Sequence, residues 1–139
     1  MTTSAHHSPD CDREFLEAFE TCALPTDRFH HRDHVRVAWL YLRQGSLMEA
    51  LERCVTGLRR FAAHHGKPGL YHETITWGFM LLIHERQQRC PTASWERFAE
   101  VNADLLTWRP SALDRYYRPE TLQSEFARRV FVLPDAGLP

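Results

Sequence analysis

The chain has 139 residues, of which 43% are hydrophobic and 25% charged, and its formal net charge is −1 at pH 7. This length fits one domain with its own core, and the composition is typical of a soluble globular protein. The charge balance gives no footprint for nucleic acid or for an anionic membrane. No apolar run approaches the ~18–20 residues of a membrane span. We therefore expect no nucleic-acid partner and no membrane partner.

The first residues, MTTSAHHSPD, contain no apolar core and do not resemble a signal peptide. We predict a flexible tail over residues 1–9, a single helical domain over 10–139 and a cytoplasmic location. No cysteine has a spacing typical of a metal site, so we expect reduced thiols, most of them in the core, with the one before Pro91 exposed. The cysteines are Cys11, Cys22, Cys54 and Cys90.

The first predicted helix covers DCDREFLEAFETCAL, residues 10–24, where apolar residues recur at helical spacing before Pro25. The second runs over about 33–44, with Asp33 as its N-cap and Gly45 as its stop. Its apolar residues surround the helix axis, which is typical of a buried helix.

The third predicted helix opens at Ser46, which has the capping-box spacing to Glu49. Its apolar residues keep to one side, as in a surface helix, until GKPG at 66–69 breaks it. The fourth runs over about 71–88 and is apolar on every face. It is the second candidate for a central helix.

The C-terminal third favours short helices. We predict one opened by Ser94, a helical turn over 111–117, and a last helix from Pro119 through Arg129. No segment has the alternation and turn residues of a β-hairpin. The sequence thus predicts an all-α fold, a single compact bundle of five or six helices around two central buried helices, about 33–44 and 71–88.

Ionisable residues open both central helices, in FHHRDHVR and in YHETIT. Burying such groups costs several kcal/mol unless they are paired or bound to an ion. His30 and His34 are spaced to lie one turn apart on one helix face. If the two helix starts meet, His72 or Glu73 could supply a third ligand, so the sequence predicts a metal site. Whether His30 or its neighbour His31 faces the site stays open, as does the choice between His72 and Glu73.

The candidate catalytic residues are Glu73 as a base, Thr76 as a hydrogen-bond donor and Arg36 as a substrate clamp or a salt-bridge partner of Glu73 or Asp33. HETIT lacks the second histidine of the zinc-protease signature HExxH, which excludes that class. Iron or zinc suits such ligands best; copper and haem are further candidates.

The first functional hypothesis is a metal-dependent hydrolase, lyase or oxygenase acting on a small polar substrate, as a monomer or a dimer. The alternatives are a non-catalytic module that binds a small ligand or haem, and a structural protein with a buried polar network. The basic pairs Arg59-Arg60 and Arg128-Arg129 have acids nearby, and we expect them on solvated helix faces.

The segments FHHRDHVRVAWLYL, GLYHETITWGFM and YYRPETLQSEFARRVFVLPD resemble a group of small bacterial helical proteins of unassigned function that carry FxHxxH and YHETxT motifs. The resemblance covers about residues 29–135. It implies one domain across that range and brings no activity, cofactor or site with it.

Overall fold

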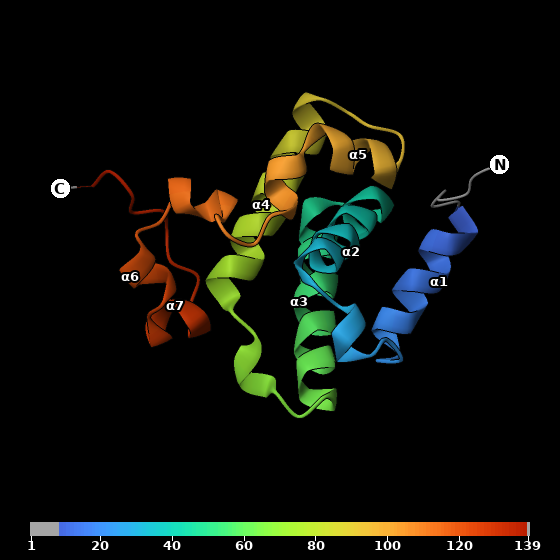
Figure 1. Cartoon of the computed structure of the whole chain (residues 1–139), viewed down its shortest axis with the longest axis horizontal. Helices are drawn as coiled ribbons and strands as arrows, with labels where there is room; N and C mark the ends of the chain where they lie inside the picture. Colours follow the sequence, from blue (N-terminus) through green and yellow to red (C-terminus); the bar gives the residue numbers. More distant parts are fainter. Residues whose placement is uncertain (1–8, 139) are drawn as a thin grey trace.

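The computed structural model describes residues 9–138 and is all-α (Figure 1). The helices are α1 Pro9–Glu20, α2 His31–Gln44, α3 Leu47–His64, α4 Glu73–Arg89, α5 Trp95–Val101, α6 Pro119–Leu122 and α7 Glu125–Arg129. Short 3-10 turns join them: η1 Thr26–Arg28, η2 Pro68–Leu70, η3 Ala103–Leu106 and η4 Ala112–Arg115. The predicted tail lies outside the described residues except for its last position, where α1 begins.

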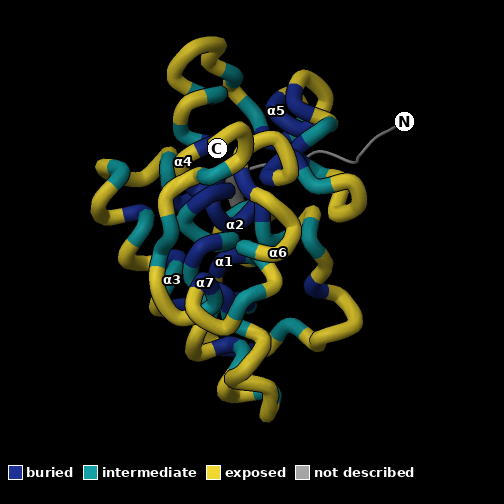
Figure 2. The backbone as a smooth tube through the Cα atoms, turned by 90° about the vertical axis from the view of Figure 1, so that its left-hand side faces the viewer, coloured by how far each residue is buried: buried dark blue, intermediate teal, exposed yellow. Residues whose placement is uncertain are grey.

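The two helices predicted to be central are central. In α2 every residue from Val35 to Tyr41 is buried, including Arg36, and Figure 2 shows buried residues gathered along this helix. In α4 the buried side chains include Phe79, Met80 and Ile83. Figure 1 places α1 on one side of the α2–α3 pair and the α6–α7 segment on the far side of α4.

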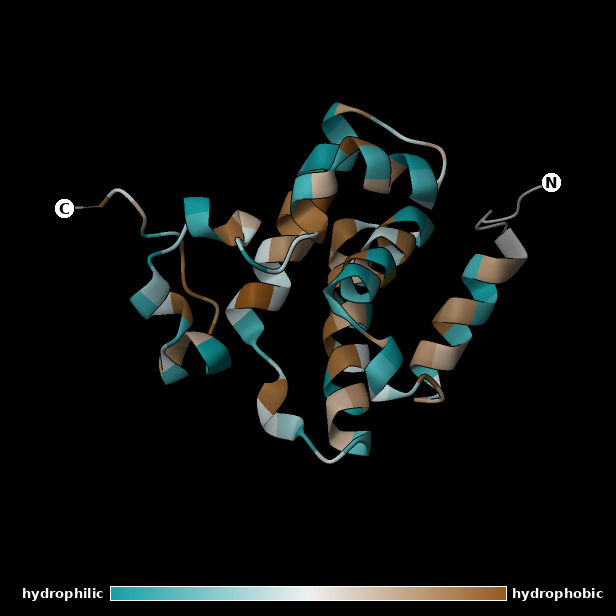
Figure 3. Ribbon diagram, viewed as in Figure 1, coloured by the Kyte–Doolittle hydropathy of each residue, from teal (hydrophilic) through white to brown (hydrophobic). Residues whose placement is uncertain are grey.

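Helix α3 is one-sided, as its apolar period predicted, and Figure 3 shows it banded with hydrophobic and hydrophilic residues. It packs closely on α1 at Gly57, where an added Cβ would lie 2.6 Å from a ring carbon of Phe19. Since Phe19 is fully buried, glycine is required here for the close approach of the two helices. Cys54, one turn earlier on α3, is also buried, as expected of a core thiol.

The capping prediction at α3 is confirmed: the Ser46 hydroxyl accepts from the Glu49 N–H, and the Glu49 carboxylate accepts from the Ser46 N–H. The N-cap prediction at α2 is wrong. His30 is the N-cap, and the Asp33 carboxylate accepts from the His30 N–H at 2.9 Å. Asp33 therefore closes the first turn from inside the helix, which begins at His31.

Two helix ends also differ from the prediction. Helix α1 stops at Glu20, because Cys22 takes a left-handed conformation with φ 62°. Pro119 opens α6 as predicted, but the helix ends at Leu122. The Ser124 hydroxyl then accepts from a backbone N–H and starts α7 separately. Serine competes well for such capping positions, so one predicted helix becomes two.

The segment after α7 packs along the first turns of α4. The Thr74 hydroxyl donates to the Val130 carbonyl at 2.9 Å and accepts from the Val132 N–H at 3.1 Å. Phe131 stacks on Trp77 with ring centroids 5.0 Å apart. These contacts hold the C-terminal segment and α7 against α4. Across residues 9–138, no helix has both the length and the apolar character needed to cross a membrane.

Candidate functional site

The start of α2 turns one of its two neighbouring histidines inward. The His31 ring lies 4.7 Å from the Phe79 ring and 5.2 Å from the Trp108 ring, between centroids. Its Nε2 lies 2.9 Å from the Leu105 carbonyl oxygen, which can only accept, so Nε2 carries a proton. His30 is exposed. His31 is therefore the histidine that faces the interior.

His34 lies one turn further along α2 and stacks on Phe29, with ring centroids 4.2 Å apart. Burial, and secondarily the neighbouring His31, lowers the pKa of His34 to about 4. The imidazole is therefore neutral at pH 7. Its ring nitrogens form no hydrogen bond with the described part of the chain. Chemically, such a group can accept a proton or ligate an ion.

His72 is committed to capping α4. Its Nδ1 accepts from the Ile75 N–H at 3.1 Å, so the proton of the neutral ring lies on Nε2, which donates to the Leu122 carbonyl at 2.7 Å. Burial lowers the pKa of His72, which favours this neutral form. Both ring nitrogens are occupied, and a metal ion could bind only by displacing one of these bonds.

Glu73 turns its carboxylate toward α3. The Tyr71 hydroxyl donates to it at 2.7 Å, and an Arg59 nitrogen lies 3.4 Å away. The Thr76 hydroxyl also interacts with the Tyr71 phenol, whose pKa is raised by burial and by the Glu73 carboxylate. Glu73 and Thr76 thus share Tyr71 as a neighbour.

Arg36 lies apart from these residues. Its guanidinium pairs with Asp12 of α1 at 2.9 Å and stacks over the Phe15 ring, 4.1 Å from its centroid. The predicted pairing with Glu73 or Asp33 is wrong, because Arg36 points to the α1 side of α2. Its contacts fasten α1 to the core.

The starts of the two central helices do not meet. His31, the first residue of α2, contacts Phe79, which lies six residues beyond the first residue of α4, or ~9 Å along the axis at ~1.5 Å per residue. Within residues 9–138, no three His, Cys, Asp or Glu side chains are placed to hold a metal ion together. The four predicted ligands therefore do not form one site in this arrangement, and metal binding stays a prediction.

A different site lies beside the start of α4. Three arginines and one glutamate surround a surface hollow of about 400 Å³, which we call the arginine basin. It is lined by Arg59, Pro68, Gly69, Tyr71, Glu125, Arg128 and Arg129. Helix α3 supplies the first arginine, α7 supplies the other two, and η2 forms the wall between them.

Local contacts set the geometry of the arginine basin. The Arg59 guanidinium lies over the Tyr71 ring, 4.8 Å from its centroid. Arg128 donates to the Gly69 carbonyl at 2.7 Å, which joins α7 to η2. Arg129 is exposed and forms no ion pair with the described residues. Sequence reasoning missed this site because the arginine pairs are almost 70 residues apart and each, taken alone, looks like a solvated helix face.

A second hollow, of about 430 Å³, lies where α1, α2 and α3 meet. Its charges balance, because Glu20 and Glu52 face Arg53 and Arg60. The Tyr41 hydroxyl also donates to Glu20 there at 2.6 Å. Even with Glu73, which pairs with Arg59 at its edge, the arginine basin has one more arginine than carboxylate. This positive charge distinguishes it from the second hollow and makes it the better candidate for a charged ligand.

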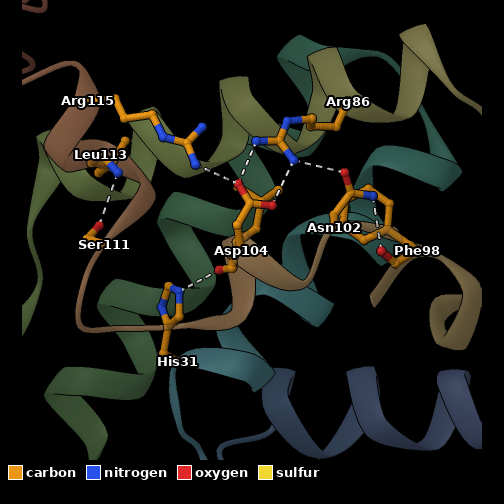
Figure 4. A network of polar contacts seen from close by, with 9 residues as sticks. His31, Arg86, Phe98, Asn102, Asp104, Ser111, Leu113 and Arg115 are labelled. Atoms are coloured by element: carbon orange, nitrogen blue, oxygen red, sulfur yellow. Dashed lines mark hydrogen bonds and ion pairs between the residues drawn. The ribbon is translucent and has the colours of Figure 1, made fainter. Parts of the chain in front are cut away.

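A polar network around Asp104 joins η3 to α4 (Figure 4). The Asp104 carboxylate accepts from Arg86 at 3.0 and 2.8 Å and from Arg115 at 3.3 Å. Arg86 also donates to the Asn102 side chain at 3.0 Å. The hydrogen bonds from Arg86 hold the pKa of Asp104 below its usual range. The polar groups of the network form hydrogen bonds with one another. The network also fixes the neighbouring Leu105 carbonyl, which accepts a hydrogen bond from His31, so its role is structural.

Comparisons of this chain with protein-family models, with curated proteins and with solved structures give no match.

Proposed function

We propose that this protein is a binding module for a small anionic molecule, which it holds in the arginine basin. The observation that carries the proposal is the convergence of Arg59, Arg128 and Arg129 on one hollow that contains a single acidic residue, Glu125. Arginine offers a planar fork of donors that matches carboxylate and phosphate oxygens. A volume of about 400 Å³ falls within the range of small-molecule sites.

The internal pairs of the arginine basin are loose. Arg59 lies 3.4 Å from Glu73, and Arg128 lies 3.7 Å from Glu125, whereas a tight charge-assisted bond measures ~2.7–2.9 Å. A bound anion would compete with these contacts at little cost. The cation–π contact with Tyr71 restricts Arg59 in advance, which lowers the entropy lost when a ligand binds.

The test is titration calorimetry of the full chain at low ionic strength with inorganic phosphate, pyrophosphate and citrate. We expect at least one of them to bind, more weakly as salt is added. Arg129→Gln should weaken binding by about five- to tenfold, since it removes one exposed charge-assisted contact. Arg97→Gln, which changes an exposed arginine on α5, is the matched control and should leave affinity unchanged. Absence of heat with every anion, or equal losses in both variants, would contradict the proposal.

Metal-dependent chemistry, the first hypothesis from the sequence, is the second candidate function. The observation in its favour is His34, a neutral imidazole with no hydrogen-bond partner in the described chain. Elemental analysis of untagged protein by plasma mass spectrometry, together with an absorption spectrum, tests it. Near one equivalent of iron, zinc or copper that His34→Ala loses would support a metal centre. A Soret band would indicate haem, and a metal-free, stably folded protein that takes up no added ion would rule this function out.

A further inference from the structure

The second hollow, of about 430 Å³, gathers charges of both signs without pairing them. Its lining residues are Glu20, Tyr41, Glu52, Arg53, Thr56 and Arg60. Within residues 9–138, none of the four charged side chains forms an ion pair. Opposite charges close together on a helix surface often do pair, as they do on α4, α5 and α7. The hollow thus keeps two carboxylates and two guanidiniums available to a ligand.

Neutral groups hold three of these charges in place. Glu20 Oε2 accepts from the Tyr41 hydroxyl at 2.6 Å. Arg53 donates to the Gln44 side-chain oxygen at 2.9 Å, and Arg60 donates to the Glu20 backbone carbonyl at 3.2 Å. Each bond restricts a charged side chain and leaves its charge uncompensated, since none of the three partner groups is ionised.

Tyr41 orients the Glu20 carboxylate from below. It is the one buried residue of this lining. Burial, and then the hydrogen bond to Glu20, raises the pKa of Tyr41, so the phenol keeps its proton at neutral pH and remains a donor. The other carboxylate oxygen, Oε1, forms no hydrogen bond with the described residues. Glu20 therefore offers a fixed acceptor to a ligand.

The lining residues of α3 place an acid and a base on one face of that helix. Glu52, Thr56 and Arg60 follow one another at intervals of four residues, so they lie on one side of α3. Their backbones span ~12 Å along the helix axis, at ~1.5 Å per residue. A ligand that lies along this face meets a carboxylate at one end, a hydroxyl in the middle and a guanidinium at the other end.

We propose that the second hollow binds a small zwitterion, a molecule with both an ammonium and a carboxylate group, such as a free amino acid. The ammonium group lies against Glu20 and Glu52, and the carboxylate group lies against Arg53 and Arg60. A simple anion or cation would be attracted by one pair of charges and repelled by the other, because the lining has no net charge. This site is separate from the arginine basin, so the inference goes beyond the proposed function.

The experiment is titration calorimetry of the full chain at low ionic strength with glycine, 4-aminobutanoate and 6-aminohexanoate. The carboxylate and the alkylammonium of matching length accompany each zwitterion, and the series varies the distance between the two charges. We expect at least one zwitterion to bind about fivefold or more tightly than both of its singly charged analogues, because it makes charge-assisted contacts at both ends. Absence of heat with every zwitterion, or equally tight binding of a singly charged analogue, would overturn the inference.

Two exposed residues of the hollow should give opposite signatures. Glu52→Gln should weaken the zwitterion about three- to tenfold and strengthen the matching carboxylate, since it leaves the lining net positive. Arg60→Gln should weaken the zwitterion by a similar factor and strengthen the alkylammonium. Glu100→Gln and Arg97→Gln, at an exposed pair on α5, are the matched controls and should change no affinity. A zwitterion affinity that neither Glu52→Gln nor Arg60→Gln lowers would count against the site.

A variant of the arginine basin separates the two proposals. Arg129→Gln should weaken phosphate and leave the zwitterion unchanged. If Arg129→Gln weakens the zwitterion and Glu52→Gln does not, the ligand lies in the arginine basin, and this inference falls while the proposed function stands. If the zwitterion behaves as expected and no anion binds to the chain, this inference stands and the proposed function falls.

Discussion

Replacing Thr74 by valine should release the C-terminal segment from α4. The Thr74 hydroxyl is fully buried and bridges that segment by donating to the Val130 carbonyl and accepting from the Val132 N–H. Valine has nearly the same shape and can do neither. The substitution therefore tests hydrogen bonding with little change in packing volume.

The magnitude follows from what each group loses. Each hydrogen bond contributes about 0.5–1.5 kcal/mol net, and a backbone N–H left buried without a partner costs about 1–3 kcal/mol. Val130 is 40% exposed, so we expect its carbonyl to find water and the main loss to be at the Val132 N–H. We expect the free energy of unfolding to fall by about 2 kcal/mol. With a urea m-value of about 1–3 kcal/mol per molar for a small protein, the midpoint falls by about 1 M.

Urea unfolding monitored by circular dichroism measures the global effect, and hydrogen exchange at the Val132 amide measures the local one. Thr56→Val, at an exposed position on α3, is the control and should change stability by less than about 0.5 kcal/mol. A loss of less than about 0.5 kcal/mol in Thr74→Val, with exchange at Val132 unchanged, would refute the bridging role of the hydroxyl.

Three further predictions concern the core. The folded pKa of His34 is depressed to about 4, so its stabilising contribution is complete above pH ~6.5 and is lost as the pH falls toward 4. Urea unfolding should give a free energy of unfolding about 1–2 kcal/mol lower at pH 5 than at pH 7. His34→Phe should reduce this dependence of stability on pH. Gly57→Ala should destabilise by about 1–3 kcal/mol in thermal unfolding despite the better helix propensity of alanine, because the added Cβ clashes with Phe19. Burial raises the pKa of the Cys54 thiol to about 12, so a thiol reagent should label exposed Cys90 at once and Cys54 only after unfolding.

The sequence was sufficient for the fold where local chemistry decides. The Ser46–Glu49 box and the first position of Pro119 depend on residues only a few places apart, and the structure has both as predicted. The two buried helices were recognisable because they are apolar on all sides. The α2 start was missed by three residues because Asp33 suits the third helical position of a capping box as well as it suits the N-cap, and only tertiary packing decides between them.

The candidate site was less predictable, because it depends on how far one helix is shifted along another. Both histidine-bearing helix starts exist, but His31 reaches the middle of α4 rather than its beginning. No local pattern encodes that offset. The arginine basin is harder still, since Arg59 and Arg128 meet only when α7 docks on η2. Each looks like an ordinary solvated side chain until the partner segment is in place.

That long separation also sets an order of events during synthesis. Arg59 leaves the ribosome 69 residues ahead of Arg128, a delay of roughly 3 to 14 s at about 5–20 residues per second. Once α4, which ends at Arg89, has also emerged, α3 and α4 can pack together while the wall that α7 supplies is still missing. An anion that needs all three arginines therefore cannot assist the early helices to assemble; it selects chains in which the last helix has already docked.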